Sequence, residues 1–133
     1  MQKFIVDANK NANKFVPLEI PKDYFVILNM STQAALRITV KITDFDNIYF
    51  NESRKSTSVL PIISNTFYTK SDNAELIINV PESNRLDVRM DTMDIKSGSG
   101  ILICRTLTFV AEDSNDYDYN DLHLTISCWK SQG

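Results

Sequence analysis

Glycine and histidine are scarce in this 133-residue chain, and their scarcity excludes whole classes of chemistry. The only glycines are Gly98, Gly100 and Gly133, so neither a P-loop nor a dinucleotide-binding fingerprint can form. His123 is the sole histidine, which makes a zinc site of the His-Glu-x-x-His kind impossible. A Ser-His-Asp triad would have to use that one residue, and we expect it to lie on the surface or in an interface instead.

Long apolar runs and an excess of positive charge are also missing. No apolar stretch approaches the roughly 18 residues of a transmembrane helix, and a net charge of −3 offers no basic surface for nucleic acid. Residues 1–7 contain only three consecutive apolar residues, too few for a signal-peptide core. We therefore expect no membrane insertion, no nucleic-acid partner and synthesis in the cytoplasm, with any export to the cell surface by a route that this sequence does not encode.

The chain has two cysteines, Cys104 and Cys128, in apolar segments on either side of a polar run. If these segments are neighbouring strands, the thiols could lie close enough to bridge. Cys128 belongs to the apolar face of its segment, however, and without a signal peptide an oxidising compartment is not assured. We expect free, buried thiols.

Alternation of apolar and polar residues dominates what is present. Residues 36–42, 86–90 and 122–128 follow the two-residue period of strands that bury one face. Shorter β-rich runs cover residues 24–28, 62–68, 76–80 and 101–110, and turn-prone clusters cover residues 81–84 and 97–100. The pattern predicts a single all-β domain, an antiparallel β-sandwich, over residues 16–133. Residues 1–15 are predicted to be a polar N-terminal extension.

Residues 112–121, the acidic run, hold five carboxylates and two carboxamides. Like charges this close repel strongly, so a folded run of this kind needs bound cations or protons. All its donor atoms are oxygens, which favours Ca²⁺ over zinc, copper or iron. Five negative charges exceed what one divalent ion balances, and we expect two adjacent ions.

The acidic run has three alternative interpretations. An EF-hand fits the spacing of Asp116, Asp118 and Asn120 but requires Gly where Asp121 stands and Glu where Ser127 stands. A solvated acidic turn without metal remains open. A glycosidase pair of Glu112 and Asp121 is disfavoured, because carboxylates committed to calcium do not readily carry protons.

The acidic run resembles the calcium loop of the bacterial calcium-mediated, LecB-like lectins, whose signature reads Glu-Asp-Gly-Thr-Asp-x-Asp-Tyr-Asn-Asp. The ten positions match without a gap and depart only at Ser114 and Asn115. Residues 29–33 are similar to the family's early Asn-Ser-Ser-Gly-Thr-Gln segment, though one residue shorter, and the chain ends in Gly133 as family members end in Gly. The resemblance implies a sandwich of about nine strands.

The resemblance also implies roles for particular residues. The calcium ligands would be Asn29, Glu112, Asp116, Asp118, Asn120, Asp121 and the main-chain carboxylate of Gly133 from a neighbouring subunit. The sugar-binding residues would be Met30, Ser31, Asp113 and Asn115.

The predicted function is therefore a calcium-dependent lectin, not an enzyme, that binds fucose- or mannose-type sugars through two Ca²⁺ ions per chain. Fucose- or mannose-containing glycans would be its partners, and the assembly would be a homodimer or homotetramer. The alternative is a calcium-stabilised β-sandwich that acts in adhesion or assembly without binding sugar.

Overall fold

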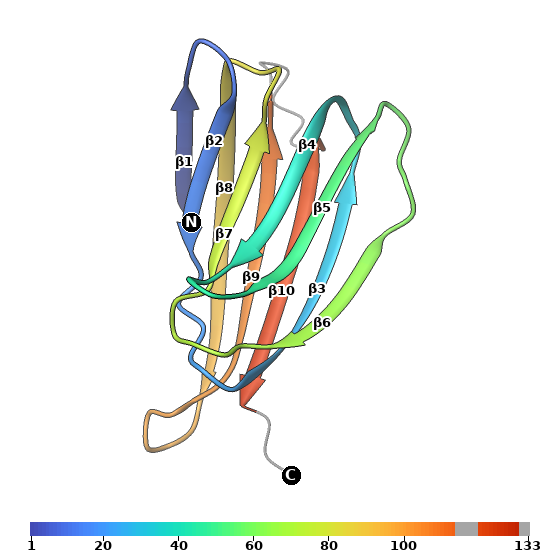
Figure 1. The fold of residues 1–133 in the computed structure, drawn as a ribbon. Helices are drawn as coiled ribbons and strands as arrows, with labels where there is room; N and C mark the ends of the chain where they lie inside the picture. Colours follow the sequence, from blue (N-terminus) through green and yellow to red (C-terminus); the bar gives the residue numbers. More distant parts are fainter. Residues whose placement is uncertain (114–119, 131–133) are drawn as a thin grey trace.

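The computed structural model describes residues 1–113 and 120–130, and these form an antiparallel β-sandwich (Figure 1). The strands are β1 (Gln2–Asp7), β2 (Ala12–Pro17), β3 (Tyr24–Thr32), β4 (Ala34–Thr43), β5 (Ile48–Ser56), β6 (Ile63–Tyr68), β7 (Glu75–Val80), β8 (Arg85–Lys96), β9 (Leu102–Glu112) and β10 (Leu122–Lys130). One sheet has the order β1-β8-β9-β10-β3-β6, and the other has the order β2-β7-β4-β5. Within the described residues no helix could span a membrane.

The all-β class and the alternating strands are confirmed. In β10 the side chains of Leu122, Leu124, Ile126 and Cys128 are fully buried, and those between them are partly or fully exposed. β4 and β7 bury alternate residues in the same way. Each sheet thus turns one apolar face inward, and the two faces form the core.

The expected polar N-terminal extension is instead built into both sheets. β1 pairs with β8 along its full length, and β2 pairs with β7. Ala12 and Val16 of β2 are buried in the core, while Phe4 and Val6 of β1 pack against it. The apolar residues in this segment are few, but their spacing of two or four places them on one face.

β5 is the other strand that the sequence patterns did not predict. It pairs with β4 at the edge of the four-stranded sheet, with two irregularities in register, and Phe50 is its only buried residue. Edge strands contact the core less than central strands, so their sequences carry a weaker alternation. With β1, β2 and β5 included, the described residues contain ten strands rather than about nine.

The two cysteines are free, as expected. Cys104 is paired with Trp129, whereas Cys128 is paired with Arg105, so the thiols are offset by one residue across neighbouring strands. Successive side chains point to opposite faces of a sheet. Cys128 therefore lies in the core and Cys104 on the outer face, where it is only partly buried.

Candidate metal and sugar site

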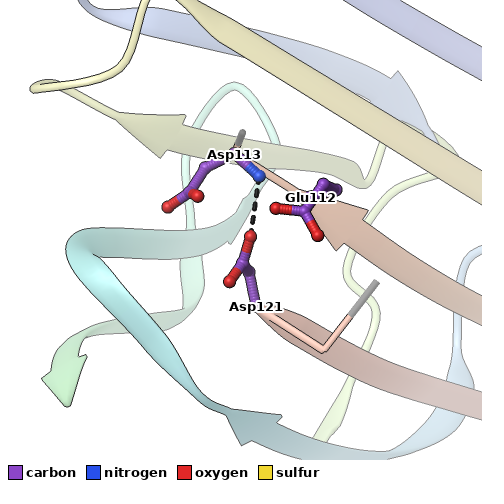
Figure 2. Close-up of side chains that lie close together, drawn as sticks. All are labelled: Glu112, Asp113 and Asp121. Carbon is purple, nitrogen blue, oxygen red and sulfur yellow. Dashed lines mark hydrogen bonds between the residues drawn. The ribbon is translucent and has the colours of Figure 1, made fainter. Parts of the chain in front are cut away.

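The two ends of the acidic run come together where β9 ends and β10 begins (Figure 2). Ala111 of β9 pairs with Leu122 of β10, which places Glu112, Asp113 and Asp121 beside one another. One carboxylate oxygen from each of these three residues lies within 4.8 Å of the others. We refer to Glu112, Asp113 and Asp121 as the acidic trio.

The acidic trio is withdrawn from solvent. Glu112 is 1% exposed, Asp121 7% and Asp113 9%. The main-chain N–H of Asp113 donates a hydrogen bond of 2.8 Å to the Asp121 carboxylate. Burial raises the pKa of the Asp121 carboxyl above its ordinary value, and the negative charge of Asp113 raises this pKa further. Hydrogen bonds from Glu112 and from the Asp113 N–H lower the pKa and offset part of the shift. The buried cluster is therefore unfavourable as three bare anions.

Oxygen donors in this arrangement fit a hard divalent cation. Carboxylates from both ends of the run are close enough to share one ion, and no softer ligand belongs to the trio. Calcium accepts such all-oxygen sets, whereas zinc in proteins favours nitrogen and sulfur donors.

Two residues outside the run, Ser83 and Gln33, hold it in place, and neither was predicted as a site residue. Ser83 Oγ lies 2.8 Å from the carbonyl oxygen of Asp113 and 2.6 Å from that of Arg85, and it can donate its proton to one of them at a time. The main-chain N–H of Gln33 donates to the carbonyl oxygen of Asp121 at 3.3 Å. These contacts attach the trio to the β7–β8 turn on one side and to the β3–β4 turn on the other.

Asp87 of β8 is a further carboxylate beside the trio. It pairs with Glu112 across the sheet and is 1% exposed. The guanidinium of Arg89 lies 3.4 Å from its carboxylate, and that of Arg85 lies 3.9 Å away. Asp87 therefore has two guanidinium groups close enough to balance its charge.

The other predicted site residues differ in exposure and in their partners. Asn120 is exposed, and its side-chain amide donates to Gln33 Oε1 at 3.4 Å. Ser31 is partly buried and pairs with His123, one residue from the start of β10. His123 itself is exposed, as expected. Asn115, Asp116, Asp118 and Gly133 lie outside the described residues.

Two predicted residues are not brought to the trio. Met30 is paired with Leu124, and its side chain is fully buried in the core. The prediction that Met30 binds the sugar is therefore wrong for its side chain. Asn29 is paired with Thr125, three positions along β3 from the Thr32–Leu122 pair. Because a strand rises by about 3.3 Å per residue, Asn29 lies roughly 10 Å along the strand from the trio. Its side-chain oxygen accepts a hydrogen bond of 2.6 Å from Ser64 Oγ instead.

Fold and site together define an all-β sandwich protein with a buried carboxylate cluster where two paired strands meet. Residues 18–130 match the family model described as fucose-binding lectin II (PA-IIL), and the chain belongs to this family. The protein is accordingly a carbohydrate-binding lectin rather than an enzyme, as the sequence predicted. No curated protein matches the sequence significantly.

Several solved structures have a similar fold, among them three lectins. The C-terminal domain of the BC2L-C lectin from Burkholderia cenocepacia is 15% identical, with a TM-score of 0.67 over 92% of this chain and 100% of that chain. A high-affinity mannose-binding lectin of Ralstonia solanacearum is 16% identical, with a TM-score of 0.60 over 86% of this chain and 95% of that chain. The Chromobacterium violaceum lectin CV2L, solved in complex with α-methyl-fucoside, is 14% identical, with a TM-score of 0.58 over 86% of this chain and 95% of that chain. At these identities the likeness establishes the fold alone.

Proposed function

We propose that this lectin binds fucose- or mannose-type sugars through two adjacent Ca²⁺ ions held by the acidic run. The observation that carries the proposal is the meeting of three buried carboxylates from the two ends of the run. Three acids crowded in this way need a cation, and their donor atoms suit calcium.

The proposed calcium ligands are the residues of the run whose positions match the family signature. They are Glu112, Asp116, Asp118, Asn120 and Asp121, joined by the main-chain carboxylate of Gly133 from a partner subunit. Bound calcium supplies open coordination positions that accept neighbouring sugar hydroxyls. Asn29 is left out of this set because its amide is engaged by Ser64, away from the trio.

Asp113 is proposed to bind the sugar directly. Its main chain is fixed by the hydrogen bonds to Asp121 and Ser83, so its carboxylate is held at a defined position. A carboxylate accepts the proton of a sugar hydroxyl in a charge-assisted hydrogen bond, which is stronger than a neutral one. Ser31 and Asn115 are proposed as additional polar contacts.

The proposed sugar class draws support from what the relatives bind. The family is described as fucose-binding, the lectin from Ralstonia solanacearum as mannose-binding, and the lectin from Chromobacterium violaceum was solved with α-methyl-fucoside. Both sugar types carry three neighbouring ring hydroxyls that a paired-ion site can accept.

Retention on mannose- or fucose-agarose tests the proposal. The protein should be retained in calcium and released by EDTA, and metal analysis after dialysis in calcium buffer should find two Ca²⁺ per chain. Asp113→Ala should weaken sugar binding while retaining both ions. Calcium binding without retention on either resin would favour the structural adhesion module, and one ion or none would contradict the paired-ion site.

The partner-subunit ligand is tested separately with tags. A C-terminal tag removes the free carboxylate of Gly133, so we expect it to lower sugar affinity and to weaken a dimer in which each tail completes the other subunit's site. A tag of equal length at the N-terminus should have neither effect. Full sugar binding by the C-terminally tagged protein would show that the Gly133 carboxylate is not a calcium ligand.

A further inference from the structure

The β1–β2 hairpin and the β7–β8 turn lie at the same end of the sandwich (Figure 1). Residues of both line a polar groove, which also includes Asp113 of the acidic trio. Residues 7–10 of the β1–β2 hairpin form one part of its lining, residues 82–85 around the β7–β8 turn form another, and Leu36 and Asp113 complete it. We call this the hairpin groove. Its volume of about 650 Å³ is within the range of small-ligand sites.

The hairpin groove and the trio share Asp113. The carboxylate of this residue belongs to the trio, and the residue also lines the groove. A sugar that binds Asp113 would therefore have the groove beside it. We propose that the hairpin groove is a second subsite, which accepts a neutral sugar residue linked to the one held at the acidic run; this inference rests on the proposed function.

The walls of the groove are tied together by main-chain hydrogen bonds. Ala8 N–H donates to Asn84 O at 2.8 Å, Asn11 N–H to Pro81 O at 2.8 Å, and Ala12 N–H to Ser83 O at 3.0 Å. Ser83 in turn contacts the carbonyl oxygen of Asp113. The hairpin, the turn and the trio are thus connected, so the groove is formed before a ligand arrives, which lowers the cost of ordering it on binding.

The chemistry of the lining favours a neutral polyhydroxyl ligand. The lining includes both the acids Asp7, Glu82 and Asp113 and the bases Lys10 and Arg85, and Asp7 lies 3.6 Å from the Arg85 guanidinium. An anionic ligand would meet the three acids, and a cationic one would meet the two bases. The amide side chains of Asn9 and Asn84 can both donate and accept, as sugar hydroxyls do, and Leu36 offers an apolar surface to the C–H groups of a sugar ring.

The hairpin wall lies outside the segment that matches the lectin family. The match covers residues 18–130, whereas the hairpin residues that line the groove are residues 7–10. The subsite would therefore involve residues that the family model does not cover. It would select for the second sugar of a glycan, while the acidic run selects the terminal one.

Calorimetric titration with matched mono- and disaccharides tests the subsite. The ligands are methyl α-mannoside with the α1-2, α1-3 and α1-6 mannobioses, and methyl α-fucoside with fucose α-linked to N-acetylglucosamine. We expect at least one disaccharide to bind three-fold or more tighter than its monosaccharide. Asn9→Ala and Asn84→Ala should each remove most of that gain and leave the monosaccharide affinity unchanged.

Asn73→Ala is the matched control, because Asn73 is an exposed asparagine just before β7, at the opposite end of that strand from the β7–β8 turn. It should change neither affinity, and melting curves should show all three variants folded. Monosaccharide binding with no gain from any disaccharide, or a gain that survives in Asn9→Ala and Asn84→Ala, would overturn the subsite alone. Failure of every sugar to bind in calcium would overturn the proposed function, and the subsite with it.

Discussion

The main-chain N–H of Asp113 donates a 2.8 Å hydrogen bond to the Asp121 carboxylate, joining the two ends of the acidic run across β9 and β10. This bond fixes one oxygen of Asp121 and leaves the carboxylate among two others that it repels. The arrangement of the trio therefore depends on strand pairing as well as on any ion it binds.

Asp121→Asn should abolish the stabilisation by calcium. An asparagine oxygen can still accept the Asp113 N–H, but the charge that attracts the ion is lost. At calcium concentrations of 100 times the Kd, the wild type should gain about 2.7 kcal/mol for each bound ion, and the variant should gain little. Melting curves in calcium and in EDTA measure the difference.

Asp46→Asn is the control for this change, because Asp46 is an exposed acid and the substitution removes the same charge. It should respond to calcium as the wild type does. In EDTA, Asp121→Asn should be at least as stable as the wild type, because the Asp121 pKa is raised in the fold and its ionised form opposes folding at neutral pH. A large loss of stability in EDTA would contradict this account.

Met30→Ala should destabilise the fold by about 2–5 kcal/mol, because the side chain is fully buried and its removal leaves a cavity. Urea unfolding in EDTA measures the loss. Met93→Ala is the matched control, since Met93 is 60% exposed and its truncation should change stability by less than about 0.5 kcal/mol. If Met30→Ala instead left the stability unchanged but lowered the sugar affinity, the original prediction that Met30 contacts the sugar would be supported.

The two thiols should react at very different rates. Burial raises the pKa of the Cys128 thiol to about 11, so it is protonated and shielded at neutral pH. Cys104 is partly exposed on the outer face. Labelling with a thiol reagent should therefore modify Cys104 first and Cys128 only on unfolding, and Cys104→Ser should remove the fast phase. Equal rates would contradict the placement of the two side chains.

Asp44 should give stability a dependence on acid pH. Its carboxylate accepts hydrogen bonds from the Tyr49 hydroxyl, from the Asn47 N–H at 2.8 Å and from Ser71 Oγ at 2.8 Å. The Tyr49 hydrogen bond is the largest cause that holds the pKa of Asp44 far below its usual range. A carboxyl whose pKa is lowered on folding stabilises the fold above its unfolded pKa of about 3.9, and the contribution is lost as the pH falls through the folded value.

Asp44→Asn should therefore be less stable than the wild type at pH 7, and the gap should narrow progressively below about pH 4. Urea unfolding at a series of pH values measures it, and the titration of the acidic trio is common to both proteins and cancels in the comparison. A gap that stays constant from pH 7 to pH 3 would show that Asp44 acts through packing rather than charge.

The sequence predicted the parts of the fold that depend on local pattern. The alternation in residues 36–42 and 122–128 is visible because those strands are central and bury one whole face. β1, β2 and β5 contribute fewer core residues, so their pattern is weak, and tertiary pairing decides their structure.

The candidate site divides in the same way. Glu112 and Asp121 were assigned to one site from the sequence because both belong to the acidic run that resembles the family's calcium loop. Asp87, Ser83 and Gln33 reach it through the register of distant strands and turns, which no local pattern reports. Met30 was assigned from a short linear match, although the two-residue period it shares with Val26 and Leu28 places it in the core.

β10 lies between β9 and β3, yet in the sequence it follows the nine other strands that the structure describes. β3 can pair on that side only after β10 has been synthesised, so the six-stranded sheet closes late and through contacts distant in sequence. Such contacts slow folding because a long loop must be closed before they form. Until then the facing edges of β3 and β9 have unpaired backbone N–H and C=O groups, and the nascent chain is most prone to aggregate in that interval.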